Sequence, residues 1–398
     1  MKNSPKTKRD PPLFYVIAGE ASGDMLGAGL VRGLRDLTGG LAQCVGIGGE
    51  RMAEEGIESL FPISEMAVMG VFEILPHAPR LLRRIAQTVD DIISKNPVAL
   101  ITIDSKAFTM RVAKRLKKIR QEGGRQIPLI HMVAPTVWAW RPGRAKVISA
   151  FLDHLLVLFP FEPPYFERHG LTTTFVGHPA ADQPKGDGLD FRIRHQIAAE
   201  AKILLVLPGS RPGEVRRLLP AFSGAVKLLA ARYANLHVVI PTVSLVENMV
   251  RTVVRNWAVP CLLVTDSARK YDAFDAADVA LAASGTVVLE LTLARVPTVV
   301  GYKVNPLSLP IGKLLVDRES VVITNRVLER QIVPFFFQGE CNPDALDVAV
   351  SCLLDNPNER LKQTQGADEV ARRLKASDEL GSNTAARAVL EAVGSNTV

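Results

Sequence analysis

The sequence has few cysteines and no long hydrophobic run. Four cysteines occur in 398 residues, without a CxxC pair or a regular spacing: Cys44, Cys261, Cys341 and Cys352. This pattern excludes a disulfide framework and favours free thiols in a reducing compartment such as the cytoplasm. No stretch of about 18 or more apolar residues is present, so we expect no membrane-spanning helix. The first apolar run, residues 13–17, is too short for the core of a signal peptide.

Acidic residues are outnumbered by basic ones, and the net charge is +7. This charge favours anionic partners: nucleic acid, an anionic membrane surface or phosphorylated substrates. We find no aromatic side chains interleaved with basic ones and no nucleic-acid-binding motif, so we expect no nucleic-acid partner. GxGxxG and DxD motifs are missing as well, so a dinucleotide is not indicated, and we expect no cofactor and no metal site.

The length and the order of the expected elements predict an α/β protein with two domains. A chain of 398 residues is about twice as long as a common domain. Short apolar segments alternate with helical segments, which indicates parallel sheets covered on both faces. The expected strands are residues 13–18, 44–49, 98–103, 127–134, 154–159, 203–207, 236–240, 261–264, 279–283, 297–301 and 321–325. Residues 180–190 would link two doubly wound domains, which would face each other across a cleft.

Residues 201–217 contain the clearest candidate for a ligand-binding turn. An apolar strand runs into Pro208-Gly209-Ser210-Arg211 and then into the start of a helix. Open α/β sheets bind ligands at the carboxyl ends of their strands, and the start of a helix attracts an anion through its N–H groups and its dipole. Arg211 adds donors that suit a phosphate, although an ordinary turn with a solvated arginine is the alternative.

A second turn of this kind follows the expected strand 279–283. Ser284-Gly285-Thr286 open a helix that carries Glu290 on its first turns, where the side chain would face the same side as the turn. A carboxylate at this place suits the two hydroxyls of a ribose. The alternative is a helix acid that the helix dipole favours.

Two stretches of the N-terminal half also place polar groups after strands. Asp104 directly follows the expected strand 98–103, where a fixed position and a partly dry cleft suit a general base. A cap for the next helix is the alternative role. Residues 19–24, GEASGD, combine two glycines that permit close backbone approach with Ser22 and Asp24, which suit the cap of the following helix.

Two surfaces suit an anionic membrane. Residues 106–125 carry eight basic residues and one acid, and the bases line the outer face of an expected helix, although a solvated face is the alternative. An apolar, methionine-rich segment edged by arginines is either core or a contact surface for acyl chains. The residues of this segment that would contact acyl chains are Met66, Met69, Val71, Phe72 and Leu75.

Together, the motifs resemble those of one family, the lipid-A-disaccharide synthases, which are inverting glycosyltransferases of outer-membrane lipid assembly. The resemblance covers nearly the whole chain. It rests on AGEASGD (18–24), Asp104, APTVWAWRPGR (134–144), FPFEPPYF (159–166), VGHP (176–179), LPGSRPGEV (207–215), ASGTVVLE (283–290) and ITN (323–325).

This resemblance implies two Rossmann-like domains in the GT-B arrangement. Residues 1–182 would form an acceptor-binding, membrane-facing domain, residues 183–345 would bind the UDP-sugar, and helices in 346–398 would cross back to the first domain. The implied reaction moves 2,3-diacylglucosamine from UDP to the 6-hydroxyl of 2,3-diacylglucosamine 1-phosphate (lipid X), giving a β-1,6-linked disaccharide 1-phosphate and UDP. The enzyme would attach peripherally to the cytoplasmic face of the inner membrane, and a homodimer is compatible with the resemblance.

The resemblance also implies roles for individual residues. Asp104 would take the proton from the acceptor hydroxyl, and Arg211 with its helix start would hold the leaving diphosphate without a metal. Residues 19–24 would close over the nucleotide from the other domain. The UDP-sugar would contact Gly19, Glu20, Ser22, Gly23, Gly209, Ser210, Ser284, Gly285, Thr286, Glu290 and Asn325.

The chain departs from the family pattern next to the proposed base. Family members usually have Ser or Ala, then Pro, Asp and Phe after this aspartate, whereas this chain has Ser105-Lys106-Ala107-Phe108. Lys106 would lower the pKa of Asp104 if it points inward. Thr324 stands where many members have proline. Two other functions are therefore open: another UDP-sugar-dependent GT-B glycosyltransferase with a lipid acceptor, and a catalytically silent paralogue that binds UDP-sugar or lipid.

Overall fold

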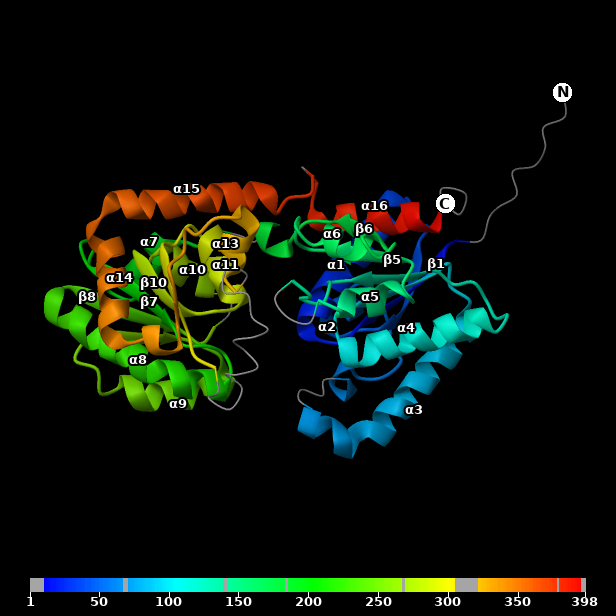
Figure 1. Ribbon diagram of the computed structural model, residues 1–398, viewed down its shortest axis with the longest axis horizontal. Coiled ribbons are helices and arrows are strands. Elements are labelled where there is room, and N and C mark those ends of the chain that lie inside the picture. The colour runs from blue at the N-terminus through cyan, green and yellow to red at the C-terminus, as the bar shows by residue number, and fades with distance from the viewer. Residues whose placement is uncertain are drawn as a thin grey trace, which may run out of the picture. The chain divides into compact units, whose positions relative to one another are not determined.

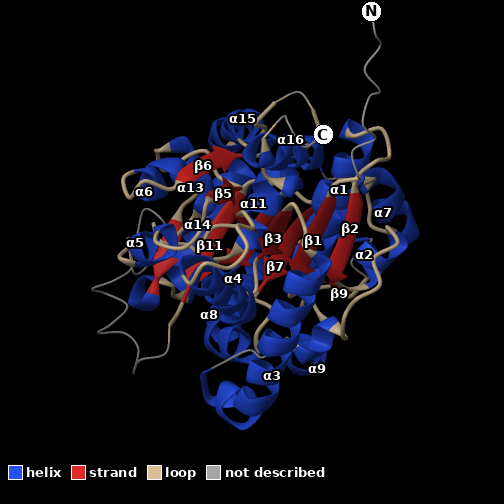
Figure 2. Cartoon of the chain, turned by 90° about the vertical axis from the view of Figure 1, so that its right-hand side faces the viewer, coloured by secondary structure: helices blue, strands red, loops and turns tan. Residues whose placement is uncertain are grey.

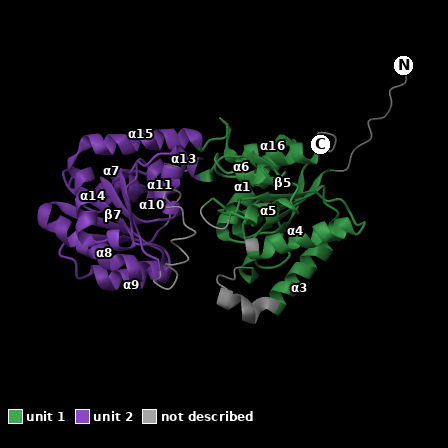
Figure 3. Ribbon diagram, in the orientation of Figure 1, with its two compact units in different colours: residues 1–179, 374–398 green, residues 180–373 purple. Residues whose placement is uncertain are grey.

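Two compact units make up the chain in the computed structural model (Figure 3): Met1–Pro179 with Leu374–Val398 form unit 1, and Ala180–Arg373 form unit 2. The structure describes residues 11–66, 71–138, 142–182, 185–266, 269–304, 321–377 and 379–394, with the side chains of 71–78 and 106 left aside. Each unit has one parallel sheet with helices on both faces (Figure 1 and Figure 2), which confirms the predicted α/β class. Unit 1 is discontinuous in sequence.

Unit 1 contains a six-stranded parallel sheet in the order β2-β1-β3-β4-β5-β6. Its strands are β1 (Leu13–Ala18), β2 (Gln43–Ile47), β3 (Ala99–Ile103), β4 (Leu129–Met132), β5 (His154–Val157) and β6 (Thr172–Phe175). Its α-helices are α1 (Ala21–Leu37), α2 (Glu50–Glu54), α3 (Val71–Lys95), α4 (Lys106–Gln121), α5 (Arg144–Ser149), α6 (Pro163–Glu167) and α16 (Gly381–Val393). The strand order reverses between β1 and β3, which places a switch point there.

The apolar pattern of the strands explains why both faces of this sheet are covered. In β1, Phe14, Val16 and Ala18 point into one core, and Tyr15 and Ile17 point into the other. Helices α3, α4 and α5 contribute to the core that contains Tyr15, while α1, α2 and α16 contribute to the opposite one. Strands with apolar residues on both faces are typical of parallel sheets.

Unit 2 contains a second six-stranded parallel sheet, in the order β12-β11-β10-β7-β8-β9. Its strands are β7 (Lys202–Leu207), β8 (Leu236–Pro241), β9 (Cys261–Val264), β10 (Val279–Ala283), β11 (Thr298–Tyr302) and β12 (Phe335–Phe337). Its α-helices are α7 (Gly188–Arg194), α8 (Pro212–Arg232), α9 (Ser244–Val254), α10 (Lys270–Asp275), α11 (Thr286–Leu293), α13 (Ile323–Leu328), α14 (Pro343–Asp355) and α15 (Pro357–Arg373). Here the strand order reverses between β7 and β10.

The segment after residue 373 completes the core of unit 1. Helix α16 packs along α1 (Figure 1), and its small buried residues join the core of α1 and β1: Ala385, Ala386, Ala388 and Val389. The two helices approach closely at Gly33, where a Cβ would lie 2.9 Å from the Ser382 carbonyl oxygen. Helices α14 and α15, by contrast, belong to unit 2.

The structure corrects two local expectations and adds a strand that was not expected. The expected linker 180–190 is part of unit 2 in its second half, because the Gly188 N–H donates to the Asp275 carboxylate (2.8 Å) where α7 begins. Residues 321–325 do not form a strand, since α13 (Ile323–Leu328) begins within them. The edge strand of this sheet is instead β12, a segment of three residues that the sequence pattern did not indicate.

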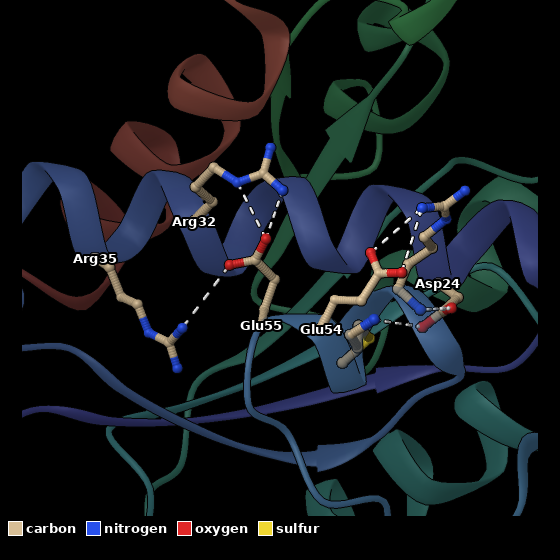
Figure 4. A network of polar contacts seen from close by, with 7 residues as sticks. Asp24, Arg32, Arg35, Glu54 and Glu55 are labelled. Atoms are coloured by element: carbon tan, nitrogen blue, oxygen red, sulfur yellow. Dashed lines mark hydrogen bonds and ion pairs between the residues drawn. The ribbon is translucent and has the colours of Figure 1, made fainter.

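Asp24 caps a different helix from the one that the sequence predicts. It lies in α1, is 4% exposed, and accepts hydrogen bonds from the N–H groups of Arg51 (2.9 Å) and Met52 (3.2 Å) (Figure 4), and also from that of Gly49 (2.7 Å). These donors are the first N–H groups of α2. The carboxylate therefore accepts their hydrogen bonds and places a negative charge at the positive end of the helix dipole. The N-cap of α1 is Glu20, without a side-chain cap bond.

Candidate active site

The carboxyl ends of β7 and β10 meet where the strand order of unit 2 reverses. Leu207 at the end of β7 pairs with Ala282 in β10, so the turns that follow both strands lie at the same edge of the sheet. Open α/β sheets bind ligands in the crevice at such a switch point. Two segments that are far apart in the sequence, residues 207–214 and 283–290, are therefore brought together.

A cavity of about 550 Å³ lies at this edge of the sheet. Its lining contains the residues that the sequence predicted from the two turns and from α11: Gly209, Ser210, Arg211, Ser284, Gly285, Thr286 and Glu290. Gly209 has a φ of +111°, which favours glycine, and the Glu214 side chain occupies the space that a Cβ would fill. Both α8 and α11 begin at this cavity, with Pro212 and Thr286 as their first residues.

The two cations that the described part of the lining contains, Arg211 and Lys270, are each paired with a carboxylate. The sequence predicted a role for Arg211 but not for Lys270. Lys270 Nζ lies 2.7 Å from Glu290 Oε2, and both side chains are about three-quarters buried, with 28% and 24% exposed. Arg211 Nη1 lies 3.2 Å from Glu214 Oε1, but the arginine is 74% exposed and can turn to an incoming anion. Burial, helped by the charge of Glu290, raises the pKa of Tyr271 to about 12.

Several lining residues were not predicted from the sequence. Thr242 follows β8, Asp266 follows β9, and Lys270 begins α10. The Oγ1 atom of Thr242 is buried and has no hydrogen-bond partner among the residues that the structure describes, which leaves it available to a ligand. Because β8 pairs in parallel with β7 and β9 pairs in parallel with β8, the strand-end rule that selected residues 208–211 would also have selected Thr242 and Asp266.

Asn325 does not line this cavity. Its side-chain oxygen accepts hydrogen bonds from the N–H groups of Ile332 and Val333 (3.0 Å each), and its amide nitrogen donates to the Val333 carbonyl (2.9 Å). The amide thus holds the segment that leads into β12, and it is 8% exposed. Asn325 borders a separate space of about 460 Å³ together with Arg330 and Phe335. Its predicted contact with UDP stays a prediction.

In unit 1, Asp104 directly follows β3 at the switch point. Ala18 of β1 pairs with Ile103 of β3, so Gly19 and Asp104 extend from neighbouring strands at the same edge. Asp104 and Ser105 have φ values of +47° and +46°, which non-glycine residues adopt at a cost. Ser105, not Asp104, is the N-cap residue of α4, so the alternative role of Asp104 as the cap is not what the structure shows.

The predicted glycine-rich turn lies beside Asp104. A Cβ on Gly19 would lie 2.0 Å from the Ser105 Cβ, so glycine is required for this close approach. Gly23 is buried near the Ile103 carbonyl, whereas Glu20 and Ser22 are exposed. These four residues belong to unit 1 and the cavity belongs to unit 2. The closure of this turn over a nucleotide stays a prediction.

Three further motifs of unit 1 come together after β4, β5 and β6. Trp138 Nε1 donates to the buried Glu162 carboxylate (3.2 Å), and the Trp138 ring meets the Phe161 ring edge-on at 5.3 Å. The rings of Phe159 and His178 lie 5.0 Å apart. Burial lowers the pKa of His178 to about 4, so this imidazole is neutral at neutral pH. The sequence order of the motifs did not predict this cluster.

The basic helix has the predicted amphipathic arrangement. Phe108, Val112 and Leu116 of α4 are buried, while Lys114 and Arg115 are exposed. Part of the charge is used internally, since Arg120 forms a two-pronged ion pair with Asp153, with both N···O distances 2.7 Å. In the part of the chain that the structure describes, no helix is both long and apolar enough to span a bilayer.

The methionine-rich segment can be judged at one residue. Met66 is 3% exposed and belongs to the core beside Leu81 and Ile85, which corrects its predicted contact with acyl chains and agrees with the core alternative. Met69 lies outside the described residues, and so do the side chains of Val71, Phe72 and Leu75.

Comparison with known proteins connects this architecture to a family. The sequence profile of the lipid-A-disaccharide synthetases matches residues 14–389. The lipid-A-disaccharide synthase of Rhodospirillum centenum is 48% identical over 385 residues, covering 96% of this chain and 95% of the relative. That of Paramagnetospirillum magneticum is 45% identical over 383 residues, covering 95% and 97%. A putative UDP-N-acetylglucosamine 2-epimerase from Listeria monocytogenes has a similar fold, with a TM-score of 0.63 at 15% identity and coverage of 97% and 96%.

Two parallel sheets, each with its polar strand ends at a switch point, define the chain as an α/β protein of the GT-B fold, which epimerases and glycosyltransferases share. Within this class the chain belongs to the lipid-A-disaccharide synthetase family, since the family profile and relatives at 45–48% identity cover nearly all of it. Its function is the synthesis of the lipid A disaccharide, as the sequence resemblance predicted.

Proposed function

We propose that this chain transfers 2,3-diacylglucosamine from UDP to the 6-hydroxyl of 2,3-diacylglucosamine 1-phosphate, with inversion at the anomeric carbon and release of UDP. The observation that carries this proposal is the cavity of unit 2, which collects Arg211, the Ser284-Gly285-Thr286 turn and Glu290 at one switch point. These groups suit the parts of a nucleoside diphosphate, and family membership supplies the identity of the sugar.

The donor site follows from the chemistry of the cavity. The leaving group gains negative charge as the glycosidic bond breaks, and the exposed guanidinium of Arg211 and the starts of α8 and α11 stabilise that charge. Glu290 offers its carboxylate to the ribose hydroxyls. Because a guanidinium and two helix starts face the leaving diphosphate, we propose that the transfer needs no metal ion.

The acceptor hydroxyl needs a base, and Asp104 is the residue that we propose for this role. Its place after β3 at the switch point of unit 1 fixes the carboxylate on a rigid element. Inversion follows if Asp104 removes the hydroxyl proton while the oxygen attacks the anomeric carbon from the face opposite to UDP. The new bond is then β from an α-linked donor.

We also propose that the enzyme works at the cytoplasmic face of the inner membrane, where acylated substrates are available. The exposed basic residues of α4 support this proposal, because each one near an anionic leaflet contributes about 1 kcal/mol. A homodimer stays an expectation of the family resemblance, which sedimentation of the purified protein would test.

The decisive experiment is turnover of UDP-2,3-diacylglucosamine with 2,3-diacylglucosamine 1-phosphate by the wild type, Asp104→Asn and Arg211→Ala. We expect each variant to lose about 100-fold or more in kcat/KM, the scale of general-base and charge-stabilising groups. Asp36→Asn, an exposed change on α1, is the matched control and keeps wild-type turnover. Full activity in Asp104→Asn would remove this residue from the reaction, and a product with an α linkage would refute inversion.

A further inference from the structure

We infer that Thr109 is a positioning residue that holds the backbone of Asp104 in the conformation needed for proton abstraction. The inference rests on the proposed role of Asp104 as the general base. Three observations in unit 1 carry it: the left-handed backbone at Asp104 and Ser105, two hydrogen bonds of Thr109, and the contact between Ser105 and Gly19.

The backbone at Asp104 needs support from its surroundings. Two consecutive non-glycine residues have left-handed φ values, +47° at Asp104 and +46° at Ser105. L-residues adopt this conformation at a cost, and strained residues persist where neighbouring groups hold them in place. Such residues cluster at active sites, where the strain gives a side chain a direction that a relaxed backbone would not give.

Thr109 supplies the support from the helix side. Its hydroxyl is completely buried and lies 2.6 Å from the Asp104 carbonyl oxygen and 3.0 Å from the Ser105 carbonyl oxygen. The bond to Ser105 is the ordinary contact of a helical threonine with the carbonyl four residues earlier. The shorter bond reaches one residue further back, to Asp104, which precedes the helix and its N-cap.

The sheet holds the same residue from the other side. The Asp104 N–H donates to the Met132 carbonyl of β4 (3.1 Å), so both polar backbone groups of Asp104 are bonded. The Ser105 side chain fills the space beside Gly19 where a Cβ would lie 2.0 Å from the Ser105 Cβ. Asp104 is thus fixed by β4, by Thr109 and, through Ser105, by the glycine-rich turn.

The direction of the Asp104 carboxylate depends on this fixed backbone. If the peptide after Asp104 relaxes toward an ordinary conformation, the carboxylate moves while the substrate sites of both units stay as they are. Displacements of about 1 Å can reduce a rate by about 100-fold, because the reacting atoms no longer meet in the productive geometry. The loss should therefore appear in kcat and leave KM nearly unchanged.

The test compares Thr109→Val, which removes the hydroxyl at nearly constant volume, with Thr109→Ser, which keeps it. Thr88→Val is the matched control, because Thr88 is also a completely buried helical threonine of unit 1. Among the described residues, its hydroxyl donates a hydrogen bond only to the Arg84 carbonyl four residues earlier (2.7 Å). Each variant is also made in the Asp104→Asn background. Thermal unfolding and UDP binding report whether the protein is folded, and Thr109→Ala serves if Thr109→Val does not fold.

We expect Thr109→Val to lower kcat about 10- to 100-fold with KM within about twofold, while Thr109→Ser and Thr88→Val stay within about threefold of the wild type. In the Asp104→Asn background, Thr109→Val should cause no further loss, because it acts through Asp104. Equal losses in both backgrounds, or a wild-type kcat in Thr109→Val, would overturn the role of Thr109 and leave the proposed role of Asp104 intact. Wild-type turnover in Asp104→Asn would overturn the proposed base and the inference with it.

Discussion

At the scale of single residues, the ion pair of Lys270 and Glu290 orients the carboxylate that we propose as the ribose contact. The 2.7 Å contact holds the carboxylate in one orientation, and both side chains are mostly buried. A free Glu290 would sample several rotamers, and the ordering of that side chain would then oppose binding. We therefore expect Lys270 to contribute to nucleotide affinity through Glu290.

Removing the lysine should weaken binding only of ligands that have ribose hydroxyls. We expect Lys270→Met to raise the dissociation constant of UDP roughly 5- to 10-fold, the scale of one hydrogen bond to a charged group. The affinity for 2′,3′-dideoxy-UDP should stay within about twofold, as measured by titration calorimetry. Lys227→Met, an exposed change on α8, is the control. An equal loss for both nucleotides would mean that Lys270 contacts the phosphates instead.

The neutral state of His178 links the stability of unit 1 to pH. Its pKa is lowered from 6.5 to about 4 by burial, so the unfolded chain binds more protons than the folded one between these values. Stability therefore falls as the pH falls from about 6.5 to about 4, by at most about 3 kcal/mol from this residue. His178→Phe keeps a ring beside Phe159 and should flatten the pH dependence of thermal unfolding in this window. Identical profiles for both proteins would contradict the assignment.

Single residues were predictable where their role is local. The Gly209 and Ser284 turns follow apolar strands, and the rule for strand ends identified both without knowledge of the sheet order. Asp24 was misjudged, and the clasp that Asn325 forms was not foreseen, because their hydrogen-bond partners come from other segments of the chain. Such a role depends on which distant segment of the chain packs against the side chain, and the local spacing of residues does not contain that information.

At the scale of elements, the buried strands and the edge strands β2 and β9 could be predicted, whereas the edge strands β6 and β12 could not. Strands such as β3 and β10 are continuous apolar runs, because helices cover both of their faces. Strand β12 is short, follows Pro334 and pairs on one side only, with β11, so it carries little periodic signal. Residues 321–325 resemble a strand in composition, but the bonds of Asn325 to the following loop favour the short helix α13.

The contact of α1 with α16 depends on a small residue at its centre. A leucine at Gly33 would meet the Ser382 carbonyl and the Ala386 side chain, because even a Cβ would lie about 3.0 Å from Ala386. We expect Gly33→Leu to destabilise unit 1 by about 1–3 kcal/mol and to expose the segment after residue 373 to proteases. Asp36→Leu, on the exposed side of α1, controls for the leucine itself. Unchanged protection of that segment would show that α16 can shift without loss.

At the scale of the whole molecule, the uneven distribution of charge predicts a salt-sensitive attachment to membranes. We expect the triple change of Lys114, Arg115 and Lys118 to glutamine to weaken binding to vesicles that contain phosphatidylglycerol roughly 100-fold at low salt. The control removes three exposed cations of unit 2, Lys227, Arg255 and Arg372, with the same change in net charge. Equal effects of the two triple changes would mean that net charge alone causes binding, and co-sedimentation with vesicles measures both.

The discontinuity of unit 1 affects how the protein folds while it is being synthesised on the ribosome. Helix α16 covers part of the apolar side of α1, yet residues 180–373 are translated between the two halves of this core. Unit 2 can therefore close its own core while the nascent unit 1 still exposes α1. A chain released before α16 emerges would present that apolar side to chaperones and proteases, so truncated products should be removed although most of the enzyme has already been made.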